Sequence, residues 1–461
     1  MMYSLSRLLF MSIVLLCFII ATVWYLIPSP IVPIMVSLIP LGILITLNQP
    51  FWLVTLFVLF SFFRIHEAIP TLYHLKIPLV LSLGALFALI WHTLLSQKIK
   101  IYGHPSLTWL GIFWGLTTMG MFTASNVELA LTAFTNVYWK IIVMTLAIIW
   151  VVNNDKHIGQ ISFSIVLSGT LIASITLYNL VNEIGLVEGT RVTIGRDIGS
   201  MLGDPNDLSL VLMFPLAFSI NLGTTKGISF LKQVIAIITT GLFIGAIMAT
   251  QSRGGLLGSL AVISICALKL IYSKNFFILL GVIGLLYLYL LSGILSKISG
   301  RFFGEIMMDE SSIGRIFAWK AAYRMAMDNP LTGVGLNNFF PNYFFYSSYW
   351  DGSNHAVHST WFGVLAEIGI PGFIVFIIFI FSVIHTARDT LRRISKSPEL
   401  FSPHLTVVAN SVYAGFIGSI VSSTFLTQAF NWPIYILAAL TIAVSNLTQN
   451  NSQNKNNNFV D

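Results

Sequence analysis

A histidine, a serine and two spaced glycines form the pattern in this sequence that is best suited to acid–base chemistry. His358 and Ser359 end a long polar segment. Gly369 and Gly372 follow within the next apolar run, which gives the order H-S-x9-G-x-x-G. A histidine at the start of a helix feels the positive end of the helix dipole, which disfavours its charged form. We therefore expect His358 to stay neutral and to act as a general base.

Other polar side chains near this pattern are lower-ranked candidates. Glu367 lies deeper along the same apolar run and is expected either to accept a proton or to pair with an arginine. His355 lies just outside the pattern and ranks after His358. Ser359 or Thr360 can cap the following helix through its hydroxyl group.

The composition predicts that helices in a membrane position these residues. Of 461 residues, 56% are hydrophobic and only 9% are charged, which leaves too little polar surface to cover a water-soluble globule. Apolar runs long enough to span a bilayer predict an all-α polytopic membrane protein with about 12 to 14 transmembrane helices. The candidate spans lie near 8–28, 31–48, 51–63, 77–95, 106–124, 127–152, 158–181, 205–222, 230–249, 255–272, 275–293, 359–387, 405–423 and 428–447. The second and third runs could also form one re-entrant pair.

The basic residues between these runs predict the orientation of the chain. They fall on one side if the N-terminus with Arg7 is cytoplasmic, as the positive-inside rule expects. Four polar connections then face outward: 64–76, 182–204, 250–254 and 294–358. The predicted organisation is N-terminal transmembrane helices over 1–293, a periplasmic loop over 294–358, C-terminal transmembrane helices over 359–447, and a disordered, Asn-rich cytoplasmic tail over 448–461.

The outer connections carry arginines close to predicted helix starts. Gly254 and Gly255 follow one of them and allow a backbone or a phosphate to approach closely, although a tight turn with an arginine reaching for the membrane surface is equally compatible. Asp204 and Pro205 form a helix-start signature, so we assign the Asp204–Asp207 turn to capping. The arginines on this face are Arg191, Arg196, Arg253 and Arg315.

Several arginines on one face suggest phosphate chemistry. A diphosphate carries about two negative charges and is held best by bidentate guanidinium groups. The sequence has no Asp-x-Asp metal signature and no Walker motif, so we expect no bound metal and assign the neutralisation to arginines. The net charge of +7 is spread over the connections without a basic stripe on a soluble domain, which excludes nucleic acid as the expected partner.

The 294–358 loop contains a predicted amphipathic helix that begins near Gly314 and ends at Asn329-Pro330. We expect this helix to lie flat on the membrane surface. An aromatic stretch follows over 339–350. It is typical of an interfacial belt, and stacking on sugar rings or on an isoprenoid chain is the sharper alternative.

These motifs together resemble the O-antigen ligase and polymerase superfamily, bacterial membrane glycosyltransferases that use glycans linked to undecaprenyl diphosphate. The resemblance covers most of the chain from about residue 127 onward. Its carriers are Arg196 leading to Gly203-Asp-Pro-Asn-Asp207, then Ser252-Arg253-Gly254-Gly255, then Gly314-Arg315 with Trp319 and Pro330-x-x-Gly333-x-Gly335, and finally H-S-x9-G-x-x-G.

The resemblance implies a GT-C-like bundle that works at the periplasmic face of the bacterial inner membrane without a nucleotide sugar, metal or other cofactor. His358 would deprotonate the acceptor hydroxyl. Arg253 and either Arg196 or Arg191, both of which precede the Asp-Pro-Asn turn, would hold the lipid diphosphate, with Arg315 as a third cation. The residues expected to support this site are Ser359, Gly254, Gly255, Glu367, Gly369 and Gly372.

The expected function is a ligase of lipopolysaccharide biosynthesis. It would transfer a glycan en bloc, with inversion, from undecaprenyl diphosphate to a hydroxyl group of lipid A core. A polymerase of O-antigen or exopolysaccharide that joins lipid-linked repeat units is the close alternative, and protein O-glycosylation is a third. A polysaccharide flippase or other transporter would need charges along a path through the bilayer, whereas Lys140 is the conspicuous charge within the predicted spans.

Overall fold

The structure, a computed structural model, describes residues 31–268, 310–350 and 352–457 together with short stretches between residues 14 and 25. Within these segments the chain forms helices and connections and no β-strand. Several of the helices are long and apolar enough to span a bilayer. The predicted class, an all-α polytopic membrane protein, is therefore confirmed.

The first half of the described chain forms helices that lead up to the connection at 182–204. These are α2 (Ile31–Asn48), α3 (Pro50–Phe62), α4 (Ile65–Ala68), α5 (Ile77–Ile90), α6 (Pro105–Phe122), α7 (Val127–Ala133), α8 (Trp139–Val151) and α9 (Asp155–Val181). One π-turn, Trp91–Leu95, extends α5, and another, Phe134–Tyr138, joins α7 to α8. The predicted span near 127–152 is therefore one continuous helical segment, and Lys140 lies within it.

The second half contains the helices that carry most of the predicted motifs. These are α10 (Pro205–Thr224), α11 (Phe230–Thr250), α12 (Arg253–Ala267), α14 (Glu310–Asp328), α15 (Phe339–Tyr346), α16 (Thr360–Lys396), α17 (Pro403–Ser423) and α18 (Trp432–Asn457). Short 3-10 turns occur at Pro70–Leu75, Met201–Gly203 and Pro398–Leu400.

Seven helical segments of the described chain are long and apolar enough to cross a membrane, or eight if α2 and α3 count as one broken span. The α2–α3 pair is bent by 104°, a geometry shared by a broken span and by the re-entrant pair named above as an alternative. The number of candidate membrane spans is below the predicted 12 to 14 for two reasons. α12 is short and α6 and α18 carry more polar residues. Most of the predicted span near 8–28 and all of that near 275–293 lie outside the described residues.

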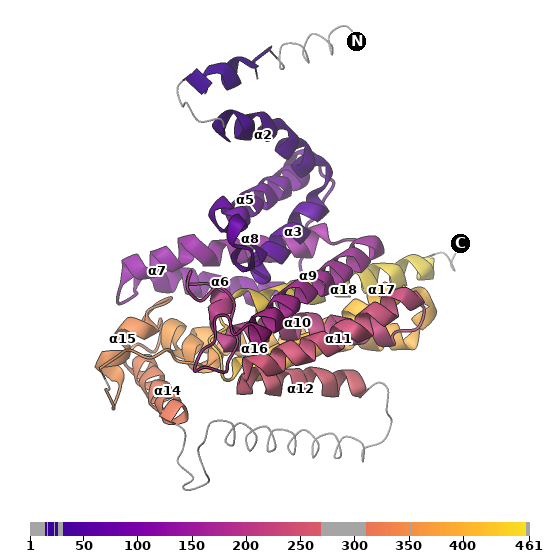
Figure 1. The fold of residues 1–461 in the computed structure, drawn as a ribbon. Coiled ribbons are helices and arrows are strands. Elements are labelled where there is room, and N and C mark those ends of the chain that lie inside the picture. The colour runs from indigo at the N-terminus through magenta and orange to yellow at the C-terminus, as the bar shows by residue number, and fades with distance from the viewer. Residues whose placement is uncertain are drawn as a thin grey trace.

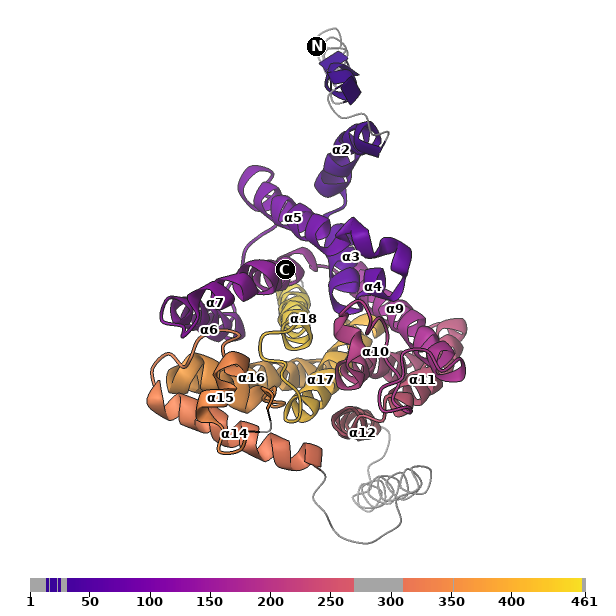
Figure 2. The ribbon, with the colours of Figure 1, turned by 60° about the vertical axis from the view of Figure 1, so that its left-hand side comes forward.

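The interior of the bundle is built around α10 and α17. In α10, 78% of the most apolar stretch is buried, against 28% for the segment Ile77–Leu95, which leaves that segment open to lipid. α10 packs against α9, α11, α12 and α17, and Figure 2 shows α10, α17 and α18 near the centre of the body. The absence of a side chain at Gly258 lets α12 and α17 approach closely. A Cβ atom at this position would lie 2.9 Å from the carbonyl oxygen of Gly418. Small residues permit such contacts between helices in lipid.

The two ends of the bundle differ in composition. α14 and α15 lie at one end and the C-terminus lies at the other (Figure 1). We call the first the site end; it contains the connections 182–204, 250–252, 329–359 and 424–431. The opposite, basic end carries Lys98, Lys100, Lys156, Lys226, Lys232, Arg388, Arg392, Arg393 and Lys396.

The end of the chain differs from the sequence prediction. We expected a disordered tail from residue 448, but α18 continues through Asn457. Asparagine and glutamine disfavour a helix only modestly, and adding residues to an existing helix avoids the cost of nucleation. The last four residues lie outside the described part of the chain.

Candidate functional site

The starts of α10 and α12 are fixed against each other at the site end. Ser252 caps α12, because its Oγ accepts a hydrogen bond from the Gly255 amide at 3.1 Å. The same hydroxyl donates to Asn206 Oδ1 at 2.8 Å. A Cβ atom at Gly255 would lie 2.1 Å from Ser209 Oγ, so this glycine is required by helix packing. Gly254 is also buried, with its Cβ position 3.4 Å from the Phe425 side chain. In the structure the space next to both glycines is therefore occupied by protein side chains.

The start of α16 joins the same assembly through the 424–431 connection. Thr360 Oγ1 donates to the carbonyl oxygen of Leu426 at 2.7 Å and accepts from the amide of Gln428 at 2.9 Å. The side chain of Gln428 then donates from Nε2 to Asp207 Oδ1 at 2.6 Å. Three helix N-termini, those of α10, α12 and α16, therefore lie close together, and their dipoles and amide groups favour an anion.

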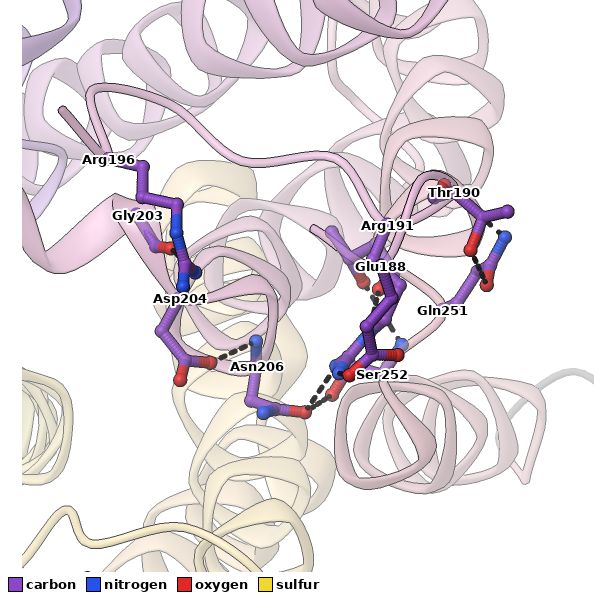
Figure 3. Close-up of polar contacts among 10 residues, drawn as sticks. Glu188, Thr190, Arg191, Arg196, Gly203, Asp204, Asn206, Gln251 and Ser252 are labelled. Carbon is purple, nitrogen blue, oxygen red and sulfur yellow. Dashed lines mark hydrogen bonds and ion pairs between the residues drawn. The ribbon is translucent and has the colours of Figure 1, made fainter. Parts of the chain in front are cut away.

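Arg191 is held inside this assembly (Figure 3). Its Nε donates to the carbonyl oxygen of Thr250 at 3.3 Å, and its Nη2 donates to Asn206 Oδ1 at 3.2 Å. A loose ion pair at 3.9 Å joins it to the exposed Glu188. Arg191 therefore ties the 182–204 connection to the turn before α12.

Arg196 lies apart from Arg191 in the same connection, on the side of Asp204 (Figure 3). Its side chain is exposed, and Nη1 donates to the carbonyl oxygen of Gly203 at 3.2 Å. A Cβ atom at Gly203 would lie 2.8 Å from the Arg196 Cα, so the glycine allows the two backbone segments to touch. Arg191 holds the connection in place through these contacts, whereas Arg196 is exposed and makes one hydrogen bond to the backbone.

The other two arginines, Arg253 and Arg315, lie within helices at the site end. Arg253 is the first residue of α12 and its side chain is exposed. Arg315 lies in the second turn of α14 and is half-buried. α14 is fastened beside α16 by Trp319, whose Nε1 donates to the carbonyl oxygen of Val357 at 3.0 Å. The Trp319 ring stacks on Phe362 with centroids 5.3 Å apart.

His358 occupies a strained backbone position between these anchors. Its φ angle is +45°, in the left-handed region that residues with side chains adopt rarely. Burial lowers the pKa of His358 below its usual value, and the Arg315 charge lowers it further. Asp204 opposes this shift in pKa and His355 adds to it. The imidazole therefore lies within electrostatic range of both α14 and the start of α10, and it is biased toward the neutral form.

The residues next to His358 have structural contacts of their own. Ser359 occupies the N-cap position of α16 but makes no side-chain capping bond, so the expected cap is wrong for this residue. Thr360 directs its hydroxyl to the 424–431 connection instead. The ring of His355 packs edge-on against Tyr343, with centroids 5.3 Å apart.

Among the described residues, Glu367 pairs with no arginine. The buried carboxylate accepts from the backbone amide of Asn337 at 2.9 Å and from that of Phe339 at 3.2 Å. Its carbonyl oxygen accepts from the Gly335 amide at 3.0 Å. These bonds fix the turn between α14 and α15 against α16 and use the carboxylate oxygens that a general base would need.

The glycines of the pattern let the same turn approach α16. Gly369 has a φ angle of +73° and breaks the helix, and a Cβ atom there would lie 2.7 Å from the carbonyl oxygen of Pro330. Gly333 also has a positive φ, and its Cβ would lie 2.4 Å from the Ala366 oxygen. At Gly372 a Cβ would lie 2.2 Å from the side chain of Ile368. The Pro-x-x-Gly turn therefore packs against Gly369, whereas Gly372 accommodates a side chain of its own helix.

Sequence reasoning missed Arg64 and Glu67. Arg64 follows α3 in a left-handed conformation, and both its Nε and its Nη2 donate to the Glu67 carboxylate. Ser200 Oγ donates to the same carboxylate at 2.5 Å, which ties α4 to the 182–204 connection. Arg64 also lies close enough to Asp207 for their charges to interact. The signal available in the sequence was the charged residue that ends the apolar run at 51–63.

Asp207, which we expected to serve only in the helix-capping turn, also contacts a residue far away in the sequence. Asp204 does cap α10, because its Oδ1 accepts from the Asn206 amide at 2.7 Å. Asp207 instead binds Gln428, which lies 221 residues away in the chain. Within the described segments no three His, Cys, Asp or Glu side chains are grouped so that they could hold a metal ion.

The sequence of one segment matches a known family. Residues 238–377 match the family model described as O-antigen ligase. The matched segment contains Arg253, Arg315 and the whole His-Ser-to-glycine pattern, whereas the two arginines of the 182–204 connection precede it. No curated protein matches the chain.

Proposed function

We propose that this multi-pass membrane protein, whose residues 238–377 match the O-antigen ligase family model, is a glycosyltransferase of the ligase and polymerase type and acts as a ligase. The donor is a glycan on undecaprenyl diphosphate, and the acceptor is a hydroxyl group of lipid A core. The single observation that carries this proposal is that Trp319 of α14 binds the residue next to His358, which brings the imidazole within electrostatic range of Arg315 and of the joined helix starts. A proton acceptor and a site for an anion are thereby adjacent.

In the proposed reaction His358 removes the proton of the acceptor hydroxyl. The acceptor oxygen forms a bond to the anomeric carbon of the glycan from the face opposite the leaving group. The bond between that carbon and the diphosphate oxygen breaks, and the diphosphate leaves with the electron pair. One displacement of this kind inverts the anomeric centre. General-base assistance contributes roughly 10²–10⁴-fold to such a step.

The diphosphate is the charged partner of the arginines in this proposal. Arg253, Arg315 and Arg196 are the guanidinium groups assigned to it, since each lies at the site end near a helix start. Arg191 is assigned to holding the 182–204 connection, because Thr250 and Asn206 already occupy two of its donors. Preorganised donors and helix dipoles stabilise charge that develops on a leaving group.

We place the site end in the periplasm of the bacterial inner membrane. The opposite end carries the lysines and arginines of at least four connections, and short basic connections stay in the cytoplasm. A donor presented at the outer face would then reach the joined helix starts directly. Cysteine labelling supports this orientation if a residue of the 182–204 connection reacts with a membrane-impermeant reagent in intact cells and a residue near Arg392 does not.

The test of function is a deletion strain complemented with the wild-type chain or with His358→Ala at equal membrane levels. The proposal expects loss of glycan-capped lipid A and accumulation of the polymeric lipid-linked donor in both the deletion strain and the His358→Ala strain. Lipid A that carries a single repeat would identify a polymerase instead. Normal capping by the His358→Ala strain would contradict the assignment of the base.

A further inference from the structure

Two elements remote from His358 in sequence fasten the backbone on both sides of it. On one side, Trp319 of α14 donates to the carbonyl oxygen of Val357 at 3.0 Å. On the other side, Thr360 binds the 424–431 connection through two hydrogen bonds. His358 lies between these two fastened residues with its left-handed φ angle of +45°.

A left-handed backbone at a residue with a side chain is unfavourable and persists only where the surrounding structure enforces it. The contacts at Val357 and Thr360 are therefore the means by which the imidazole is held. The contact at Thr360 in turn requires that the 424–431 connection is itself held in position.

Gln428 joins this connection to the start of α10, whereas Trp361 and Tyr435 bind it at Thr424 and Ala429. Its side chain is 1% exposed, and its Nε2 donates to Asp207 Oδ1 at 2.6 Å. Its backbone amide donates to Thr360 Oγ1 at 2.9 Å. One residue thus bridges the start of α10 to the start of α16, and a buried hydrogen bond of this kind is costly to leave unmade.

We propose that Gln428, through Asp207 and Thr360, is a positioning residue that sets the location of His358 relative to the anion site. This inference rests on the role proposed for His358 and extends it to Asp207 and Gln428, which lie outside the matched segment 238–377. The bridge spans the helix start expected to face the diphosphate and the one that carries the base. Displacing a catalytic group by about 1 Å can lower a rate by about 10²-fold.

The first experiment breaks each half of the bridge in the full-length protein. Gln428→Met removes the bond to Asp207 while preserving volume, and Thr360→Val removes both bonds of the hydroxyl. Initial rates of glycan transfer in membranes are measured at varied donor and acceptor concentrations. Each variant is expected to lower kcat by about 10²-fold and to change KM for the donor by less than about threefold. Thr441→Val, a buried threonine that bonds only within α18, serves as the matched control and should keep the wild-type kcat.

The second experiment restores each bond with different groups. Thr360→Ser keeps a hydroxyl group and should return kcat to within about threefold of wild type. The double variant Asp207→Asn with Gln428→Glu exchanges donor and acceptor, so the hydrogen bond re-forms in the opposite direction. Recovery of kcat by this exchanged pair to within about tenfold supports positioning, because a variant that merely misfolded would not recover.

The outcomes separate this inference from the proposed function. If Gln428→Met and Thr360→Val keep wild-type kcat while His358→Ala is inactive, the positioning role is wrong and the base assignment stands. If the exchanged pair is as impaired as Gln428→Met, the bond to Asp207 is not what matters and the inference is overturned. If His358→Ala itself transfers glycan normally, the proposed function of the site has failed first.

Discussion

The two halves of the H-S-x9-G-x-x-G pattern are used differently, although Glu367 lies only nine positions after His358. The first half faces Arg315 and the joined helix starts, where the imidazole interacts with several charges. In the second half the Glu367 carboxylate is bonded to two backbone amides, and Gly369 makes room for the Pro330 carbonyl. A residue capable of acid–base chemistry is therefore available for it only when its polar atoms do not already form hydrogen bonds that hold the fold.

The largest expected effect removes the base from the first half. His358→Ala should lower the rate of glycan transfer by roughly 10²–10⁴-fold, because general-base assistance is lost. Glu367→Gln should lower thermal stability, since an amide group would face one of the two backbone amides, and should leave kcat nearly unchanged. Transfer assays on membranes with matched protein levels measure both. Equal loss of kcat in the two variants would remove the distinction between the halves.

A second effect concerns the guanidinium groups near the first half. Arg253→Lys should lower transfer by about 10–10²-fold, nearly as much as Arg253→Ala, because an ammonium group cannot form the same two-pronged contact with a phosphate. Arg392→Lys at the basic end is the matched control, since that side chain is 72% exposed and far from the site. A fully active Arg253→Lys enzyme would mean that Arg253 acts only as an exposed surface charge.

A third effect belongs to the second half and concerns stability. Gly369→Ala should destabilise the protein by about 1–3 kcal/mol, because its φ is positive and the new Cβ would press on the Pro330 carbonyl. Gly314→Ala in α14 is the control, because no atom lies within 4 Å of its Cβ position. Thermal unfolding in detergent compares the two. If the variants unfold at the same temperature, the packing of the Pro-x-x-Gly turn against Gly369 does not contribute to stability.

The smallest effect concerns pH. Burial and Arg315 lower the pKa of His358, so the transfer rate should stay level as the pH falls through the usual histidine value of about 6.5 and decline only in more acidic solution. Arg315→Gln removes one cause of the lowered pKa, so the decline should begin at a higher pH. Lys320→Gln, an exposed lysine on the same helix, should leave the profile unchanged.

The same shift has a consequence for stability. A histidine with a lowered pKa in the folded state binds a proton more weakly than it does in the unfolded chain. The contribution of neutral His358 to stability is therefore complete above about pH 6.5 and decreases as the pH falls below that value.

The Arg315→Gln variant tests the kinetic prediction. If its pH profile of kcat is the same as that of the wild type, the result argues against electrostatic contact between α14 and the base.

Much of the bundle could be predicted from apolar run length, since the hydrocarbon core demands continuous helices of a minimum length. The spans predicted near 158–181, 205–222, 230–249 and 405–423 correspond to α9, α10, α11 and α17. The helix count was less predictable. Polar residues inside α6 and α18, and the sharp bend between α2 and α3, make length and hydropathy ambiguous there.

Local composition and spacing were enough to predict the membrane class, the helix starts and the residues able to do chemistry. The sequence by itself could not determine which polar groups would be committed to the fold. The bonds from Glu367 to residues 337 and 339, from Ser252 to Asn206, and from Gln428 to Asp207 cross between helices. Only tertiary structure decides such pairings, because each depends on where a distant segment comes to lie.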